Sequence, residues 1–365
     1  MSLKSKFFMA IFVLIIVTVS ITGCLANDSP NDVIESENNN EDINNNESIN
    51  ENEKKPIEKD PVEEIDMTLN PNEMGEIMIL MYHGISEKEA SWERTPENFR
   101  NDLEYMYQND FRMISLNDYA KGIINTEAGY TPIILTFDDG RQNNFNIIEK
   151  DNGEIEIDPN CAVGILEEFK KKYPDFNVTA SFFLGTNIFG QEKYKDYKLK
   201  YLIDNGYDVG NHTYSHNVMA EQNKEEIMFE LGAINNILKS YLPDYEIETM
   251  ALPEGSNPKD EFIQYAMEGE FEGAKYKHIA VLDVGWRPAF SPFDTDNDFT
   301  SLYRVTASEI NVGGCGITDY FNQYADEKRN IFISDGNPDV VTIPKKFEEY
   351  INMEVVGNRI LNIYE

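Results

Sequence analysis

The chain has 365 residues and a formal net charge of −35, with 31 Lys and Arg against 66 Asp and Glu. This imbalance argues against nucleic acid as a partner, because phosphate binding requires clustered Lys and Arg. It also argues against charge attraction to an anionic membrane, so neutral or amino-bearing ligands fit better.

The first 24 residues predict an exported protein. A lysine-containing start precedes an apolar run at 7–19, the order of a secretory signal peptide, and this run is short for a membrane span. The following residues 21–24 (ITGC) resemble a bacterial lipobox, in which Cys24 is lipidated. We expect a lipoprotein on the outer face of the bacterial cell membrane. An ordinary cleaved signal peptide and a single N-terminal anchor helix are the alternatives.

Residues 25–73 are dominated by Asn, Glu, Asp and Ser and cannot bury a core. We expect a disordered, self-repelling linker there that lifts the following domain away from the membrane. One folded domain is expected at 74–365. Cys161 and Cys315 can pair or stay free, and we favour free thiols because a large domain does not depend on a disulfide. The oligomeric state is left open.

Strand-like and helix-like segments alternate along this domain, and alternation of this kind predicts an α/β fold with a parallel sheet. An acidic stretch at 143–159 is expected to be a long loop or insertion. Helices are expected from Thr95 onward and at 116–124, 161–173, 199–205 and 223–241, and strands at 76–82, 112–115, 132–137, 178–184, 247–252, 279–282 and 330–334.

Two adjacent acids follow the apolar strand expected at 132–137. Asp138 and Asp139 precede Gly140, so the strand is predicted to end in a turn that presents both carboxylates. The carboxyl ends of strands are where active sites gather in α/β proteins. A solvated Asp-Asp-Gly turn is the alternative.

Two of the four histidines, His212 and His216, follow another strand-like stretch. Over one helical turn, four-residue spacing places both rings on the same side, where they can share a metal ion. Two imidazoles and one carboxylate leave a coordination position open, as in a catalytic zinc site. The other carboxylate can then accept the proton of a water molecule.

The two motifs, TFDDG at 136–140 and HTYSH at 212–216, resemble those of the polysaccharide deacetylases, the NodB-like enzymes of carbohydrate esterase family 4. Supporting pieces occur in the same order, MYHGIS at 81–86 and ASFFL at 180–184, and the resemblance spans roughly 77–345. It implies a distorted (β/α) barrel of the NodB-homology type, with a metal ion at the carboxyl ends of the strands.

The resemblance also implies roles for single residues. Asp139, His212 and His216 would hold a divalent metal, with Zn favoured and Co, Ni or Mn as alternatives. Asp138 would be the general base for water attack on an N-acetyl group, and a backbone N–H after Asp139 would stabilise the oxyanion. The expected substrate is N-acetylhexosamine in a cell-envelope or extracellular polysaccharide.

Two departures from the family pattern concern the third and fifth motifs. At 251–255 (ALPEG), the usual Arg and aromatic residue are absent. No His follows His278, so the family's general acid is missing from the late strand at 330–334. Asp335, if burial raises its pKa, and His83 are our candidates for that acid. His278 itself is expected at the surface.

We assign Tyr214, Pro253, Trp286 and Arg287 to substrate binding. An aromatic ring can stack on a sugar face, which suggests a glycan contact for Trp286. Arg287 would replace the missing Arg by pairing with Asp138. A packed Trp and a surface Arg are the alternative for this pair.

The sequence therefore predicts a metal-dependent N-deacetylase of a glycan. One alternative is a membrane-tethered glycan-binding pseudoenzyme that keeps the fold and metal site without turnover. The other is an esterase that removes O-acetyl groups from a polysaccharide.

Overall fold

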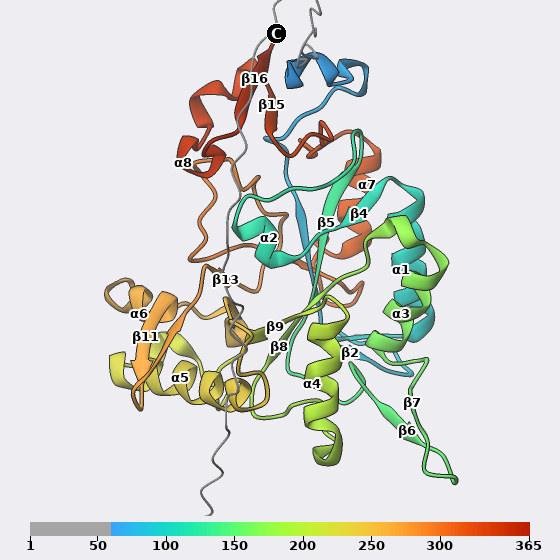
Figure 1. Ribbon diagram of the computed structural model, residues 1–365, viewed down its shortest axis with the longest axis vertical. Coiled ribbons are helices and arrows are strands. Elements are labelled where there is room, and N and C mark those ends of the chain that lie inside the picture. The colour runs from blue at the N-terminus through green and yellow to red at the C-terminus, as the bar shows by residue number, and fades with distance from the viewer. Residues whose placement is uncertain (1–59) are drawn as a thin grey trace, which may run out of the picture. The chain divides into compact units, whose positions relative to one another are not determined.

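The computed structural model describes residues 60–365 (Figure 1). The predicted signal peptide, the lipobox with Cys24 and the linker up to residue 59 lie outside the described residues. The described chain starts before the domain boundary placed between 73 and 74, with two short 3-10 helices, and Asn72 and Glu73 are already buried. None of the described helices combines the length and apolar character needed to cross a membrane.

A parallel sheet forms the centre of the molecule. Its strand order is β13-β10-β9-β8-β5-β1-β14, and β4 pairs with the start of β5. A parallel bridge between Leu282 and Leu302 joins the segment before β14 to β13, so the two edges of the sheet approach each other. The strands are β1 (Met78–Tyr82), β4 (Phe111–Met113), β5 (Thr131–Phe137), β8 (Ser181–Leu184), β9 (Asp208–Asn211), β10 (Thr249–Ala251), β13 (Ala280–Leu282) and β14 (Val305–Thr306).

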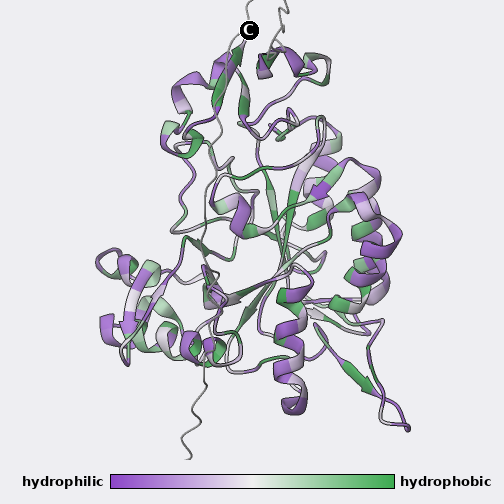
Figure 2. Cartoon of the chain, in the orientation of Figure 1, coloured by the Kyte–Doolittle hydropathy of each residue, from purple (hydrophilic) through white to green (hydrophobic). Residues whose placement is uncertain are grey.

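This curled sheet with its surrounding helices is a distorted (β/α) barrel, which confirms the predicted fold class. The helices are α1 (Pro96–Gln108), α2 (Leu116–Ala120), α3 (Ala162–Lys172), α4 (Lys195–Asp204), α5 (Lys224–Tyr241), α6 (Ile263–Met267), α7 (Ile317–Ala325) and α8 (Met353–Val356). Figure 2 shows hydrophobic residues along the central strands and hydrophilic residues on the outer faces of the helices.

Local sequence signals account for the helix starts. Thr95 caps α1 by accepting a hydrogen bond from the N–H of Asn98, and Pro96 occupies the first turn, as predicted. Asn223 and Glu226 form a reciprocal capping box at α5. Between these helices every residue of β5 is buried, which explains its continuous apolar sequence.

Several small elements were not expected. The stretch 143–159 contains the hairpin of β6 (Ile147–Glu149) and β7 (Ile155–Ile157), and the strand expected at 330–334 is reduced to isolated bridges. The other additions are β2 (Gly84–Ile85), β3 (Glu93–Arg94), β11 (Glu268–Phe271), β12 (Ala274–Lys277), β15 (Val340–Pro344), β16 (Ile360–Tyr364) and the 3-10 helices η1 (Pro61–Glu64), η2 (Met67–Leu69), η3 (Pro174–Phe176), η4 (Glu192–Tyr194), η5 (Met219–Glu221), η6 (Pro253–Gly255), η7 (Asp260–Phe262) and η8 (Lys345–Tyr350).

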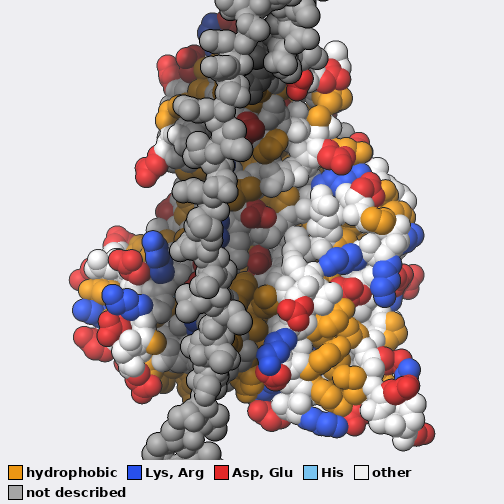
Figure 3. All heavy atoms as spheres, viewed as in Figure 1, with side chains coloured by type: hydrophobic (Ala, Val, Ile, Leu, Met, Phe, Trp, Pro, Cys, Tyr) orange, Lys and Arg blue, Asp and Glu red, His pale blue; other side chains and the backbone are white. Residues whose placement is uncertain are grey.

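Two further expectations concern single side chains. Cys161 is buried, Cys315 is half-buried, and both are free thiols. The surface position expected for His278 is wrong, because this residue is 1% exposed and its Nδ1 lies 2.7 Å from the carbonyl oxygen of Ala266. On the face shown in Figure 3, acidic and basic side chains are interspersed, without a continuous basic patch.

Candidate metal centre

The candidate site is built where neighbouring parallel strands end. Phe137, the last residue of β5, pairs with Tyr82 of β1 and with Phe182 of β8. On the other side of β8, Leu184 pairs with Asn211, the last residue of β9. The segments that follow β5 and β9 therefore leave the same edge of the sheet, which brings the acid pair and the histidine motif together.

Asp139, His212 and His216 converge on one point. Asp139 Oδ1 lies 3.4 Å from His212 Nε2 and 3.5 Å from His216 Nε2. One donor atom from each of the three residues lies within 4.8 Å of the others. Partial burial raises the pKa of Asp139, but the hydrogen bonds from His212 and His216 lower it by more, so its pKa is well below the ordinary value. The carboxylate is therefore ionised and available as a ligand.

The histidines reach this point from a loop, so the expected helical turn is wrong. Thr213 and His216 have φ values of 64° and 57°, in the left-handed region, and this bends the chain tightly. Two short-range bonds hold the bend, from the N–H of Thr213 to Asn211 Oδ1 at 2.9 Å and from the N–H of His216 to Thr213 Oγ1 at 3.1 Å. The sequence spacing identified the pair but not the backbone that positions it.

The environment of His212 suits a metal ligand. The ring is 3% exposed, and Nδ1 lies 2.8 Å from the carbonyl oxygen of Ala251, where β10 ends. A carbonyl oxygen can only accept, so Nδ1 donates its hydrogen there, and Nε2 is the ring nitrogen that faces Asp139. Such a bond to the second ring nitrogen is typical of metal-binding histidines. The two nitrogens and one carboxylate fit zinc, with positions left for other ligands.

Asp138 is held by an arginine that the sequence analysis missed. Arg304 donates from Nη1 to Asp138 Oδ1 and from Nη2 to Asp138 Oδ2, each at 2.8 Å. Arg304 is fully buried, and its Nε also donates to the carbonyl oxygen of Asp283 at 2.8 Å. Burial raises the pKa of Asp138, whereas Arg304 and His212 lower it, and the net pKa is below the ordinary value. The carboxylate thus stays ionised although it is 1% exposed.

Arg304 makes the contact that was expected of Arg287. Arg287 instead lies 3.7 Å from the carboxylate of Glu76, at the amino end of β1, and stacks over Phe290. At this position Arg287 does not contact Asp138, and its assignment to substrate binding is not supported. The only sequence signal for Arg304 is an arginine within the apolar segment before β14, because a buried guanidinium requires a carboxylate partner.

A second arginine borders the metal ligands. Arg141 donates to Asp139 Oδ2 from Nε at 2.9 Å and from Nη2 at 2.7 Å, and it also contacts Glu93. Asp139 therefore directs Oδ1 to the histidines while Oδ2 is occupied by Arg141. This second contact orients the carboxylate, and it was also missed from sequence.

His83 lies beside Asp138, as one of our two candidates for the general acid requires. Its Nε2 is 4.0 Å from Asp138 Oδ2, and its ring lies 4.7 Å from that of Trp92. Its Nδ1 is buried and has no hydrogen-bond partner among the described residues. Burial lowers the pKa of His83 to about 4, against the raising effect of Asp138, so the ring is neutral at pH 7.

Asp335 does not lie at this site. Its carboxylate accepts hydrogen bonds from Thr342 Oγ1 at 2.7 Å and from the N–H of Asn337 at 2.7 Å, and its own N–H points to buried Glu73. The segment before it bridges to residues that precede β1, at the opposite end of the sheet from Asp138. Burial does raise the pKa of Asp335, as expected. The assignment of a catalytic role is nevertheless wrong, because this acid cannot reach the substrate of the metal centre.

The remaining predicted substrate residues divide into two groups. Pro253 begins the turn after β10, directly beyond the carbonyl of Ala251 that binds His212, and Tyr214 is exposed between the two histidines. Trp286 is 64% exposed, but its carbonyl oxygen is bound by Tyr320 of α7, away from the strand ends. Trp92, whose ring is tilted by 42° against that of His83, is the tryptophan beside Asp138 and His83.

Comparisons with known proteins find a matching family model and several similar solved structures. Residues 126–272 match the family model described as polysaccharide deacetylase. No match was found among curated protein sequences. The structure is similar to the deacetylase PplD of Streptococcus pyogenes in complex with acetate, at 19% identity and a TM-score of 0.49 over 64% of this chain and 92% of that one.

Two other solved structures illustrate the range of similar proteins. IcaB of Ammonifex degensii is 17% identical with a TM-score of 0.44, over 64% of this chain and 93% of that one. A CE4 family pseudoenzyme of Bacillus anthracis is 30% identical with a TM-score of 0.23, over 28% of this chain and 33% of that one.

Proposed function

We propose that the protein is a metal-dependent hydrolase that removes N-acetyl groups from N-acetylhexosamine residues of a cell-envelope or extracellular polysaccharide. The observation that carries this proposal is the pairing of two differently held acids. Asp139 faces two histidines, and Asp138, its neighbour, is buried against Arg304. One acid is placed to bind a cation and the other to accept a proton.

The residues present fit a divalent ion. When bound to Asp139, His212 and His216, a zinc-type ion supplies Lewis acidity that polarises the acetyl carbonyl and makes water more acidic. Asp139 is already ionised, as such an ion requires, and the hydrogen bond at Nδ1 of His212 leaves Nε2 as the nitrogen that faces the site.

The chain's own residues account for the proton transfers. Asp138, kept ionised by Arg304, takes a proton from the water whose oxygen forms the new bond to the acetyl carbon. The carbon–nitrogen bond then breaks, acetate leaves, and the sugar nitrogen takes up a proton. His83 is our candidate to deliver it, because its Nε2 lies 4.0 Å from Asp138 and Asp335 is excluded by position.

The low pKa of His83 determines how this residue would protonate the sugar nitrogen. A neutral ring at pH 7 lacks the acidic second proton of an imidazolium, so it would relay the proton that Asp138 removes from water. His83→Gln should therefore lower kcat while leaving metal binding intact. Unchanged turnover in this variant would exclude the relay.

The test of the proposed function is acetate release from N-acetylglucosamine oligomers and from peptidoglycan, with and without added Zn. We expect metal-dependent release that is lost in His212→Ala and in Asp138→Asn. Release from an O-acetylated xylan alone would identify the esterase alternative.

One observation favours the pseudoenzyme alternative. The segment 330–334 and the Asp335 that follows it bring no general acid to the site, because the Asp335 carboxylate is bonded to Thr342. Metal and glycan binding without acetate release from either substrate would support it.

We further propose export and lipidation at Cys24, with the lipid as the contact to the membrane. Labelling with a radioactive fatty acid in a bacterial host should mark the protein but not Cys24→Ala. Label in both would contradict the lipobox assignment.

A further inference from the structure

A row of three aromatic rings, two exposed and one half-buried, leads away from the metal centre. Tyr214, Phe229 of α5 and Phe271 of β11 form this row, which we call the aromatic track. The ring centroids of Tyr214 and Phe229 are 5.3 Å apart, and those of Phe229 and Phe271 are 5.5 Å apart. Tyr214 is 36% exposed and Phe229 is 40% exposed. Three elements distant in sequence thus contribute one continuous apolar surface.

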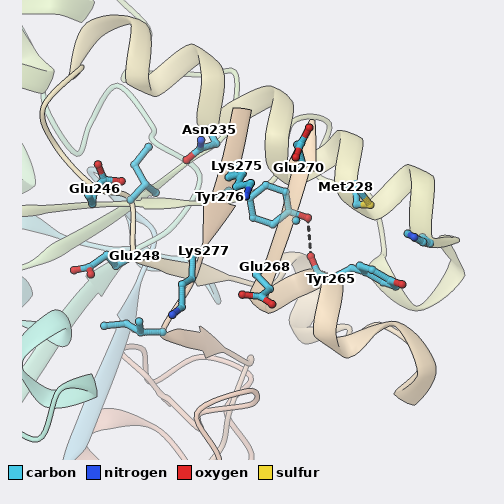
Figure 4. Close-up of a pocket in the computed structure, with 14 residues that line it drawn as sticks. Met228, Asn235, Glu246, Glu248, Tyr265, Glu268, Glu270, Lys275, Tyr276 and Lys277 are labelled. Atoms are coloured by element: carbon cyan, nitrogen blue, oxygen red, sulfur yellow. Dashed lines mark hydrogen bonds between the residues drawn. The ribbon is translucent and has the colours of Figure 1, made fainter. Parts of the chain in front are cut away.

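The far end of the track is held in place. A Cβ on Gly232 would lie 2.2 Å from Cβ of Phe271, so the glycine in α5 makes room for this ring. The hairpin β11–β12 that carries Phe271 is anchored by Tyr276, whose hydroxyl donates to the carbonyl oxygen of Tyr265 at 2.7 Å (Figure 4). Tyr276 is 4% exposed. Phe271 is therefore fixed against α5 by packing.

The near end of the track belongs to the metal loop. Tyr214 stands between His212 and His216, so its position is determined by the same bend that brings the two ligands together. The next residue, Ser215, donates its N–H to the carboxylate of Glu230 in α5 at 2.8 Å. This bond ties the loop to the helix that carries Phe229. The chain itself, through Tyr214, and the hydrogen bond from Ser215 to Glu230 therefore connect the track to the candidate active site.

The surroundings restrict what can bind to the track. Exposed carboxylates flank it, with Glu225 one turn before Phe229 on α5 and Glu270 and Glu272 on either side of Phe271. Lys275 lies opposite Glu270 in the hairpin, so the net charge of this group is negative. These charges repel an anionic polymer and tolerate a neutral or amino-bearing one. The rings pack edge to face, with interplanar angles of 60° and 82°, and the surface that Tyr214 and Phe229 leave exposed offers apolar contact to the C–H faces of sugar rings.

We propose that the aromatic track binds successive sugars of an N-acetylhexosamine chain beyond the residue that is deacetylated. The proposal rests on the proposed function and specifies its substrate as a chain longer than two sugars. Each ring removes apolar sugar surface from water, so affinity should rise with chain length until the track is covered. A dimer presents fewer sugars to the track than a hexamer does.

The experiment compares N-acetylglucosamine dimer and hexamer on the purified protein and on Phe229→Ala, Phe229→Trp and Phe271→Ala. Hexamer binding is measured by calorimetry after EDTA treatment, so it does not depend on turnover, and acetate release is measured with Zn. We expect the alanine variants to bind hexamer about 10-fold more weakly, and their kcat/KM ratio of hexamer to dimer to fall similarly. Phe229→Trp should retain both values.

Tyr197→Ala is the matched control, because Tyr197 is 39% exposed and paired with Tyr201 on α4, outside the track. Its hexamer affinity should equal that of the parent protein. Track-dependent hexamer binding without acetate release would support the track and refute the proposed hydrolysis. Acetate release that is equally sensitive to the alanine changes for both lengths, or hexamer that does not bind the parent protein, would overturn the track.

Discussion

Replacing Arg304 by Met tests how the protein keeps a buried carboxylate ionised. The guanidinium is fully buried and makes two 2.8 Å contacts to Asp138, which is itself 1% exposed. Methionine has a similar length but no charge, so Asp138 would be left buried without its partner. Breaking a buried pair from one side costs about 3–5 kcal/mol. That is a large share of the roughly 5–15 kcal/mol that stabilises a typical domain.

The same reasoning predicts partial recovery in a double variant. In Asp138→Asn/Arg304→Met no uncompensated charge remains, so the free energy of unfolding should exceed that of Arg304→Met alone by about 1–3 kcal/mol. Arg287→Met is the matched control. Its 3.7 Å contact to Glu76 is only partly buried, and its loss should cost at most about 1 kcal/mol.

The pH dependence of Arg304→Met follows from the carboxylate. Burial raises the pKa of Asp138 and Arg304 lowers it, so in the variant the raising effect dominates. A native pKa above that of the unfolded chain means that stability falls as pH rises through this window. The difference from the parent protein should therefore be larger at pH 8 than at pH 4.

Urea unfolding followed by far-ultraviolet circular dichroism measures these differences, with EDTA present so that metal release does not contribute. A loss below 1 kcal/mol in Arg304→Met at pH 8 would refute the reasoning. So would a double variant that is no more stable than this single variant.

Three further predictions concern other parts of the molecule. We expect equilibrium dialysis to detect one tightly bound Zn in the parent protein and none in His212→Ala. Equal Zn binding in both proteins would contradict the assignment of the metal site. Burial raises the pKa of Asp208 to about 6 from 3.8, so stability should fall as pH rises through this window. In urea unfolding, Asp208→Asn should therefore gain stability over the parent by roughly 1–3 kcal/mol at pH 8 and little at pH 4, whereas exposed Asp204→Asn should show no such trend. Gly75→Ala should cost at least about 1–3 kcal/mol in the same assay, because the new Cβ would lie 2.1 Å from the backbone of Ile331. An unchanged unfolding midpoint in Gly75→Ala would contradict this close approach.

Local sequence was sufficient where a feature depends on neighbouring residues. The apolar run 132–137 predicts a buried strand, and the observed strand, Thr131–Phe137, ends where Asp138 and Asp139 begin. The helix caps at Thr95 and Asn223 are likewise readable, because a capping side chain bonds to backbone two or three residues away. The identity of the candidate ligands Asp139, His212 and His216 also follows from short motifs.

Local sequence failed where the partner is remote. Arg304 is separated from Asp138 by 166 residues, and nothing near either residue indicates the pair. Arg287 was expected to replace the Arg that is missing at 251–255, but the chain carries it to the amino end of β1. The spacing of His212 and His216 suggested a helical turn, whereas left-handed backbone at Thr213 and His216 makes a loop.

Sequence by itself thus determined the class of fold and the chemical groups offered to the site, because strand periodicity, caps and motif spacing are short-range properties. Only the tertiary structure decided which groups meet. The register of the parallel strands places Asp138 and His83 at one end of the sheet and Asp335 at the other. Burial against Arg304 then determines that Asp138 stays ionised. Charge state depends on neighbours in space, and those neighbours are set by how the sheet closes and not by the order of residues along the chain.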